Sequence, residues 1–120
     1  ELEKNPSNVN AMVALGKQML TIEAYHDALK YFNQAMQFAP TAASPKAMAG
    51  YANYLLENYY GAIALYRAAL KIDEADPLVY KRLGLAYQAL GDGTNASKAF
   101  QKYLEVAPDA PDRKEIERFL

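Results

Sequence analysis

The sequence has no cysteine and only one histidine, His26. The lack of cysteine excludes disulfides, thiolate nucleophiles and cysteine-ligated metal sites. Without a second imidazole, a transition-metal site or a Ser–His pair would need an unusual arrangement. His26 follows Tyr25 at the start of an expected helix, and we interpret it as a solvated side chain rather than a base or a ligand. We therefore expect no metal, no cofactor and no enzymatic activity.

A charge excess and long apolar runs are also missing. The 13 basic and 14 acidic residues give a formal net charge of −1, whereas a general nucleic-acid binder would show a basic excess. No apolar run approaches the ~20 residues that span a bilayer. We therefore expect a soluble chain that binds no nucleic acid and does not insert into a membrane. The compartment stays open between cytoplasm and periplasm, because both admit a cysteine-free domain.

What the sequence does contain is a pattern that returns every 34 residues. Gly16, Gly50 and Gly84 share one position of this pattern. A small residue recurs at Ala28, Ala62 and Ala96, and an aromatic residue recurs at Phe32, Tyr66 and Phe100. Apolar residues between these positions recur at three- and four-residue spacing, which is typical of helix faces. A fixed period of this length indicates stacked helix pairs.

The repeated motif resembles the tetratricopeptide repeat, over nearly all of residues 2–120. The resemblance implies an all-α fold, a right-handed α-solenoid of antiparallel helix pairs with about seven helices. The segment from Tyr103 to Asp112 is similar to bacterial members of the family that work at the cell envelope or in protein assembly. In this family the scaffold binds other proteins and carries no catalytic site.

In the expected organisation, one domain spans residues 1–120. It comprises repeats at 9–42, 43–76 and 77–110, followed by a capping helix at 111–120. Residues 1–8 are either the tail of a preceding helix, ended by Pro6, or a polar leader. Because the chain begins with Glu rather than Met, we interpret it as a fragment of a longer protein. Further repeats or an anchor before residue 1 stay open.

Local signals give the helix limits. We expect helices at about 8–21, 25–38, 45–57 and 59–72, with the first helix of repeat three beginning at Asp76-Pro77 as a cap and an N1 proline. Ser7 or Asn8 is the expected cap of the first helix, and Ser44 that of the helix at 45–57. A final helix beginning at Pro111 would lay Ile116, Phe119 and Leu120 over the last repeat, as terminal caps do.

Repeat two departs from the family pattern in its first helix. Lys46 and Ala49 replace an aromatic residue and a leucine, and Asn53 replaces a common tyrosine. This helix is rich in small residues, so we expect it to bury less apolar area and to be less stable than its neighbours. Phe32, Tyr66 and Phe100 are expected to fill the core between helix pairs.

The resemblance also implies where a partner would bind. In the family, the first helices of successive repeats line a concave groove. Carried over position by position, the groove residues are Asn10, Val13, Lys17, Leu20, Thr21, Ala47, Met48, Tyr51, Tyr54, Leu55, Leu78, Lys81, Arg82, Leu85 and Gln88. The first helices carry Lys17, Lys46, Lys81 and Arg82 and no carboxylate before Glu57. This distribution predicts a positive groove with aromatic residues at its centre.

We therefore expect a scaffold for complex assembly that binds a peptide or helix of a protein partner. The partner segment would be apolar or aromatic, with acidic character or a free C-terminal carboxylate. The alternative is a module that self-associates through its groove or its end faces. Some members of the family hold the C-terminal Asp of chaperones with a clamp of Lys, Asn, Asn, Lys and Arg. The corresponding residues here are Val13, Lys17, Met48, Leu78 and Arg82, and only Arg82 matches, so chaperone-tail binding is not expected.

Overall fold

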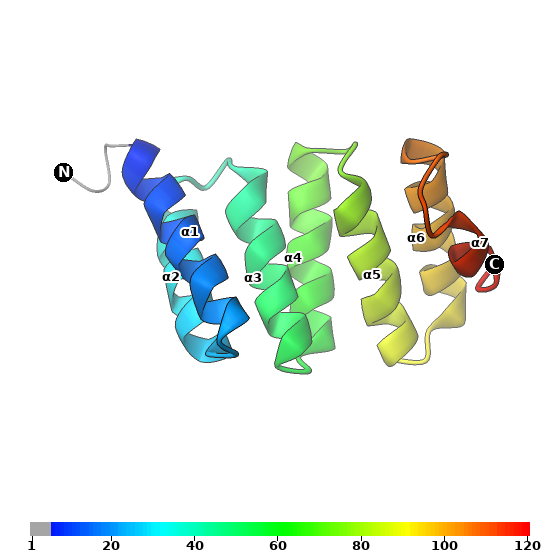
Figure 1. Ribbon diagram of the computed structural model, residues 1–120, viewed down its shortest axis with the longest axis horizontal. Helices are drawn as coiled ribbons and strands as arrows, with labels where there is room; N and C mark the ends of the chain where they lie inside the picture. Colours follow the sequence, from blue (N-terminus) through cyan, green and yellow to red (C-terminus); the bar gives the residue numbers. More distant parts are fainter. Residues whose placement is uncertain (1–5) are drawn as a thin grey trace.

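The described part of the chain folds into helix pairs stacked side by side along one axis. The computed structural model describes residues 6–120. Its helices are α1 (Pro6–Thr21), α2 (Tyr25–Phe38), α3 (Ala43–Leu55), α4 (Tyr59–Ile72), α5 (Pro77–Ala89), α6 (Gly93–Val106) and α7 (Arg113–Glu117). Neighbouring helices run antiparallel through short turns (Figure 1). With no strand between residues 6 and 120, this is the all-α solenoid of helix pairs that the sequence predicts.

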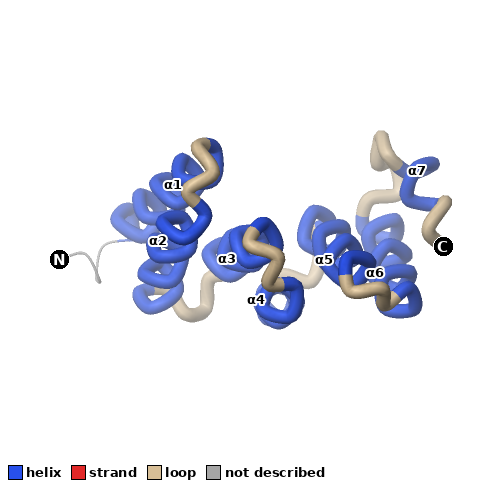
Figure 2. Tube along the Cα trace, turned by 90° about the horizontal axis from the view of Figure 1, so that it is seen from below, coloured by secondary structure: helices blue, strands red, loops and turns tan. Residues whose placement is uncertain are grey.

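The stack is elongated. Its principal extents are 48 × 25 × 23 Å and its radius of gyration is 14.7 Å, above the roughly 13.6 Å of a compact domain of this length. The first helices α1, α3 and α5 lie along one side, and α2, α4 and α6 along the other (Figure 2). α3 contacts both α1 and α5. The first helices therefore form a continuous surface, as the expected groove requires.

Within each pair, a glycine of the first helix meets an aromatic ring of the second. Phe32, Tyr66 and Phe100 are all 0% exposed. A Cβ added to Gly50 would lie 2.8 Å from Tyr66 Cε1, and one added to Gly16 or Gly84 would overlap Phe32 or Phe100. The glycines are therefore needed because the rings lie directly on the backbone of the first helices.

The buried side chains form three clusters along the stack. One joins α1, α2 and α3, the next joins α4, α5 and α6, and the last joins α6 to α7 through Phe100, Tyr103, Leu104 and Ile116. The first two clusters use residues of neighbouring helix pairs and the third uses the terminal helix, so a pair completes its core only by stacking.

Several helix limits differ from the sequence expectations. α1 begins at Pro6, so Ser7 and Asn8 lie inside the helix and are not its cap. α3 begins at Ala43 after Ala42, which makes no side-chain cap bond, so the predicted cap at Ser44 is wrong and the predicted helix at 45–57 is shifted by two residues. Pro45 still lies in the first turn, where its missing N–H is tolerated. Of the helix tail or polar leader expected over residues 1–8, residues 6–8 belong to α1 instead, and residues 1–5 lie outside the described residues.

The C-terminal cap is shorter than predicted. α7 covers only Arg113–Glu117 rather than starting at Pro111. Ile116 is 3% exposed, whereas Phe119 is 46% and Leu120 50% exposed. The Phe119 ring still lies 5.5 Å from that of Phe100. One apolar side chain of the segment is therefore buried, and the other two cover the last helix pair only partly.

Candidate functional site

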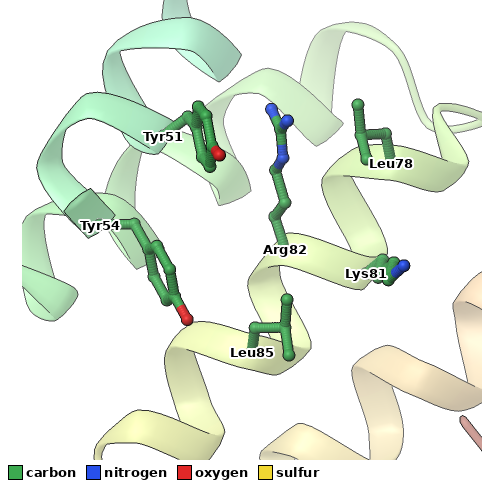
Figure 3. Close-up of a pocket in the computed structure, with 6 residues that line it drawn as sticks. All are labelled: Tyr51, Tyr54, Leu78, Lys81, Arg82 and Leu85. Atoms are coloured by element: carbon green, nitrogen blue, oxygen red, sulfur yellow. The ribbon is translucent and has the colours of Figure 1, made fainter. Parts of the chain in front are cut away.

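Two adjoining cavities lie on the surface formed by the first helices. The first has a volume of 260 Å³ and is lined by Tyr51 and Tyr54 of α3 and by Leu78, Lys81, Arg82 and Leu85 of α5. Figure 3 shows the two tyrosines facing α5 across this cavity, with the Arg82 side chain extending between Tyr51 and Leu78. All six residues belong to the predicted groove set.

Arg82 is held in place by an aromatic contact. Its guanidinium carbon lies 3.7 Å from the centroid of the Tyr51 ring. A cation over an aromatic face is attracted by the ring quadrupole, by about 0.5–2 kcal/mol depending on solvation. Part of the guanidinium edge stays available for a ligand, because stacking uses its face and leaves its N–H groups in the plane.

Tyr54 lies beside Tyr51 on the α3 wall of the cavity and faces α5 (Figure 3). Its ring makes an edge contact with Tyr59, with centroids 5.4 Å apart and an interplanar angle of 63°. Burial, followed by the neighbouring phenols of Tyr59 and Tyr51, raises the pKa of Tyr54. The phenol therefore stays neutral at physiological pH and offers a hydroxyl beside an apolar wall.

Lys81 does not act as a free positive charge in this site. Its Nζ forms an ion pair with Asp112 Oδ2 at 2.7 Å, and its side chain points away from the two tyrosines (Figure 3). Asp112 Oδ1 also accepts a hydrogen bond of 2.7 Å from the Tyr103 hydroxyl. Lys81 and then Tyr103 lower the pKa of Asp112, while burial and Asp112 raise the pKa of Tyr103 to about 12. The groove is therefore less positive than the count of first-helix charges suggests.

The second cavity, of 200 Å³, continues the groove toward the beginnings of α3 and α5. It shares Leu78 and Arg82 with the first cavity and adds Lys17 of α1 and Met48 of α3. It also includes residues that sequence reasoning missed, above all Tyr66 of α4 and the acidic residues Asp73 and Asp76 in the α4–α5 connection. The one sequence signal for Tyr66 was that a tyrosine replaces the phenylalanine of the other two repeats.

The remaining predicted groove residues lie outside these cavities. Val13 is buried in the core of the first helix pairs, and Leu20 packs against the same core. Asn10, Thr21 and Gln88 are exposed, and Leu55 is half-buried. Residues of α3 and α5 therefore dominate the site, and α1 contributes Lys17 alone.

Neither metal chemistry nor a membrane span is visible in residues 6–120. No group of three or more His, Cys, Asp or Glu side chains lies close enough together there to hold a metal ion. No helix in the same range is both long and apolar enough to cross a bilayer.

Comparisons with known proteins identify the repeat. A family model described as "TPR repeat" matches residues 50–91, and one described as "Tetratricopeptide repeat" matches residues 79–110. Among curated proteins, the general transcriptional corepressor ssn6 of Schizosaccharomyces pombe is 24% identical over 117 residues, which are 96% of this chain and 11% of that protein. The chain therefore spans about a tenth of this relative.

Solved structures show the same fold. The first TPR of Spaghetti (RPAP3), bound to the HSP90 peptide SRMEEVD, superposes with a TM-score of 0.89 at 18% identity and covers 96% of this chain and 92% of that one. The TPR2AB domain of yeast Sti1, in complex with HSP90, gives 0.88 at 20% identity over 96% of this chain and 46% of that one. The two family matches together span residues 50–110, and the chain belongs to the tetratricopeptide repeat family.

Proposed function

We propose that this domain is a non-catalytic scaffold that binds a segment of a partner protein in the groove between α3 and α5, and so mediates complex assembly. The observation that carries the proposal is the 260 Å³ cavity, which places two tyrosines, two leucines and an oriented arginine on one open surface. Tyrosine and arginine are enriched where protein interfaces gain most of their binding energy.

The same residues suggest the chemistry of the partner. Tyr51, Tyr54, Leu78 and Leu85 form walls that suit an apolar or aromatic side chain. Arg82 suits an acidic group or a free C-terminal carboxylate near that anchor, since its planar N–H groups can bind a carboxylate with two hydrogen bonds. Lys17 can add charge at the far end, whereas Lys81 already pairs with Asp112.

Two structural neighbours were solved with HSP90, one of them with an HSP90 peptide. They support peptide or protein binding by this fold. Binding of the same chaperone tail is not part of the proposal, because four of the five clamp positions carry other residues here, namely Val13, Lys17, Met48 and Leu78.

Selection of peptides from a random library displayed on phage, followed by titration calorimetry with synthetic peptides, tests this function. Tyr51→Ala and Tyr54→Ala should each weaken binding by more than ~1 kcal/mol if these rings are anchors. Tyr60→Ala is the matched control, because Tyr60 lies on α4 and is 76% exposed. If Tyr51→Ala and Tyr54→Ala bind the peptides as tightly as the wild type and Tyr60→Ala do, the groove proposal is refuted.

Self-association is the competing function, and solution mass distinguishes it. A monomer at every concentration leaves the groove free for a partner. An oligomer that dissociates on Tyr51→Ala or Tyr54→Ala would replace the proposal with self-assembly through the groove. An oligomer that ignores both changes would assign assembly to the end faces.

A further inference from the structure

Tyr66 carries a buried hydroxyl that the fold does not use. The residue is 0% exposed, and its Oη has no hydrogen-bond partner in the described part of the chain. The equivalent residues 34 positions away, Phe32 and Phe100, fill the same core position without a hydroxyl. Burying a donor without a partner disfavours folding. The ring therefore satisfies packing, and the oxygen calls for a separate explanation.

The hydroxyl belongs to the groove side of the molecule. The Tyr66 ring leaves α4 and packs on Gly50 of α3, and the residue lines the 200 Å³ cavity together with Met48, Val79 and Arg82. Burial is the main factor that raises the pKa of Tyr66, and Arg82 opposes it. The phenol is therefore protonated under all physiological conditions and remains a hydrogen-bond donor close to Arg82.

The size of the cavity limits its occupant. Sites for whole small-molecule ligands measure about 300–1,000 Å³, so a volume of 200 Å³ suits a single side chain. The cavity shares Leu78 and Arg82 with the larger groove cavity. A segment that lies in the groove can therefore place one side chain beside Tyr51 and Tyr54 and another beside Tyr66.

The charges around the cavity favour a neutral group. Lys17 and Arg82 are balanced by Asp73 and Asp76. The two carboxylates are held by backbone bonds, from the Ala75 N–H to Asp73 Oδ1 and from the Leu78 N–H to Asp76 Oδ1, each 3.1 Å long. A carboxylate entering this cavity would lose its water and meet Asp73 and Asp76 as well as the two cations, so its charge brings no net gain. A neutral polar group needs only hydrogen bonds.

Donors and acceptors in the cavity match a carboxamide. Tyr66 and Arg82 can donate to a carbonyl oxygen, while Ser44, Asp73 and Asp76 can accept from an NH₂ group. An amide side chain has both kinds of atom. We propose that the Tyr66 cavity is a subsite for an Asn or Gln side chain of the segment bound in the groove, with Tyr66 Oη donating to the amide oxygen.

This inference rests on the proposed function, but its first test needs no peptide. Tyr66→Phe removes only the hydroxyl oxygen. It leaves at position 66 the same phenyl ring that Phe32 and Phe100 provide in the other two repeats. ¹H–¹⁵N NMR titration with propionamide and with propionate, read at the Ala47 and Val79 amides, compares a neutral amide with a carboxylate of the same shape. We expect the wild type to bind propionamide at least fivefold more tightly than propionate, and Tyr66→Phe to lose that preference. The control Tyr60→Phe removes an exposed hydroxyl and should keep it.

Thermal unfolding separates binding from structure. If the hydroxyl is unpartnered in the free protein, Tyr66→Phe melts at the wild-type temperature or above it. A lower melting temperature would show that the hydroxyl stabilises the fold, and would overturn the proposal. Equal binding of propionamide and propionate to the wild type would overturn it as well.

Groove peptides provide the second test. Peptides that require Tyr51 should carry Asn or Gln at one fixed position. Changing that residue to Leu should weaken binding to the wild type about tenfold, which corresponds to about 1.4 kcal/mol, and should have no effect on binding to Tyr66→Phe. If Tyr66→Phe still binds the Asn or Gln peptide tenfold more tightly than the Leu peptide, the subsite proposal is refuted, whereas the groove proposal is not affected. If no peptide binding depends on Tyr51, the groove function fails, and the propionamide titration still decides the subsite.

Discussion

Glu23, Glu57 and Gly91 occupy the same position in the three turns that join the helices of a pair. Their φ angles are 61°, 63° and 77°, all in the left-handed region. In each turn the next residue donates an N–H to the helix carbonyl five positions before it, as in Asn58 to Asn53 at 2.8 Å. This is the hydrogen bond of a Schellman cap, which favours glycine. Only the third turn has glycine, so the first two carry strain.

Glu57→Gly should therefore stabilise the domain. A left-handed conformation costs a non-glycine residue about 1–2 kcal/mol, and the greater freedom of glycine in the unfolded chain offsets part of the gain. We expect the free energy of unfolding in urea to rise by roughly 0.5–1 kcal/mol. The reverse change, Gly91→Ala, should lower it. A lower free energy of unfolding for Glu57→Gly, or a higher one for Gly91→Ala, would contradict the claim that Glu57 is strained.

The glycines that face aromatic rings obey a different constraint. A Cβ on Gly84 would lie 2.7 Å from Phe100 Cδ1, whereas one on Gly93 would meet nothing within 4 Å. Gly84→Ala should therefore lower the free energy of unfolding by about 1–3 kcal/mol through overpacking, despite the better helix propensity of alanine. Gly93→Ala is the matched control and should be neutral or slightly stabilising. Denaturant unfolding followed by circular dichroism measures both.

At the scale of elements, Asn53 links the end of α3 to the start of α4. Its Nδ2 donates to the Ala49 carbonyl at 2.9 Å, and its Oδ1 accepts from Asn58 Nδ2, also at 2.9 Å. Asn58 caps α4 by accepting from the Gly61 N–H at 3.2 Å. The departure from tyrosine noted in the sequence thus places a buried polar group, 8% exposed, at a helix junction.

Asn53→Ala should destabilise the second helix pair. The change removes both side-chain bonds and frees the capping residue Asn58, so we expect a loss of about 1–3 kcal/mol in the free energy of unfolding. Hydrogen exchange should show the largest increases at the start of α4. Exchange that rises instead in α1 or α6, with α4 unchanged, would argue against this role.

The short α7 is attached through Asp112. Because Lys81 and Tyr103 lower the pKa of Asp112 in the folded protein, its contribution to stability is present above the ordinary value of 3.8. That contribution is lost as the pH falls through the lowered pKa. Asp112→Asn removes it at all pH values.

We expect Asp112→Asn to increase hydrogen exchange in residues 113–117 at neutral pH while α1 to α5 stay protected. In the wild type, the same exchange should increase only below about pH 4. Lys102→Gln is the control, because it removes only an exposed i,i+3 pair with Glu105 on α6 and should change little. Unaltered protection of the segment in Asp112→Asn would show that Ile116 alone holds it.

The sequence correctly predicts the limits of those helices whose ends are set by nearby capping residues or turns. α2 and α4 match their expected limits, and Asp76 caps α5 through the Leu78 N–H with Pro77 at the first helical position, as predicted. The predicted cap at Ser44 is wrong because α3 begins at Ala43, two residues before the expected start at residue 45. Side-chain propensity alone does not reveal this longer helix. Repeat boundaries at 9–42, 43–76 and 77–110 stay a prediction.

The candidate site was only partly accessible to sequence reasoning. Six groove residues meet in one cavity, because helical spacing places them on the same faces of α3 and α5. The pairing of Lys81 with Asp112 joins residues 31 positions apart, and the approach of Tyr66 to the groove depends on how its ring crosses Gly50. Both features arise from packing between helices, which no single-helix pattern contains.

At the scale of the whole molecule, stacking spreads the core along the long axis and leaves the groove open. The three core clusters lie between helices, whereas the cavity beside Tyr51 and Tyr54 opens at the surface of α3 and α5. We expect light scattering on a sizing column to give the monomer mass at all concentrations. A mass that rises with concentration would favour the self-assembly alternative.

The most direct test of the groove is chemical-shift mapping of the ¹⁵N-labelled domain with a peptide selected on it. The account predicts that the largest changes fall on Tyr51, Tyr54, Arg82 and Leu85, with α2 and α6 unaffected. The Tyr51→Ala variant should show these shifts only at higher peptide concentration. Shifts that concentrate on α2, α4 and α6 instead would contradict the groove and place the partner on the opposite side of the stack.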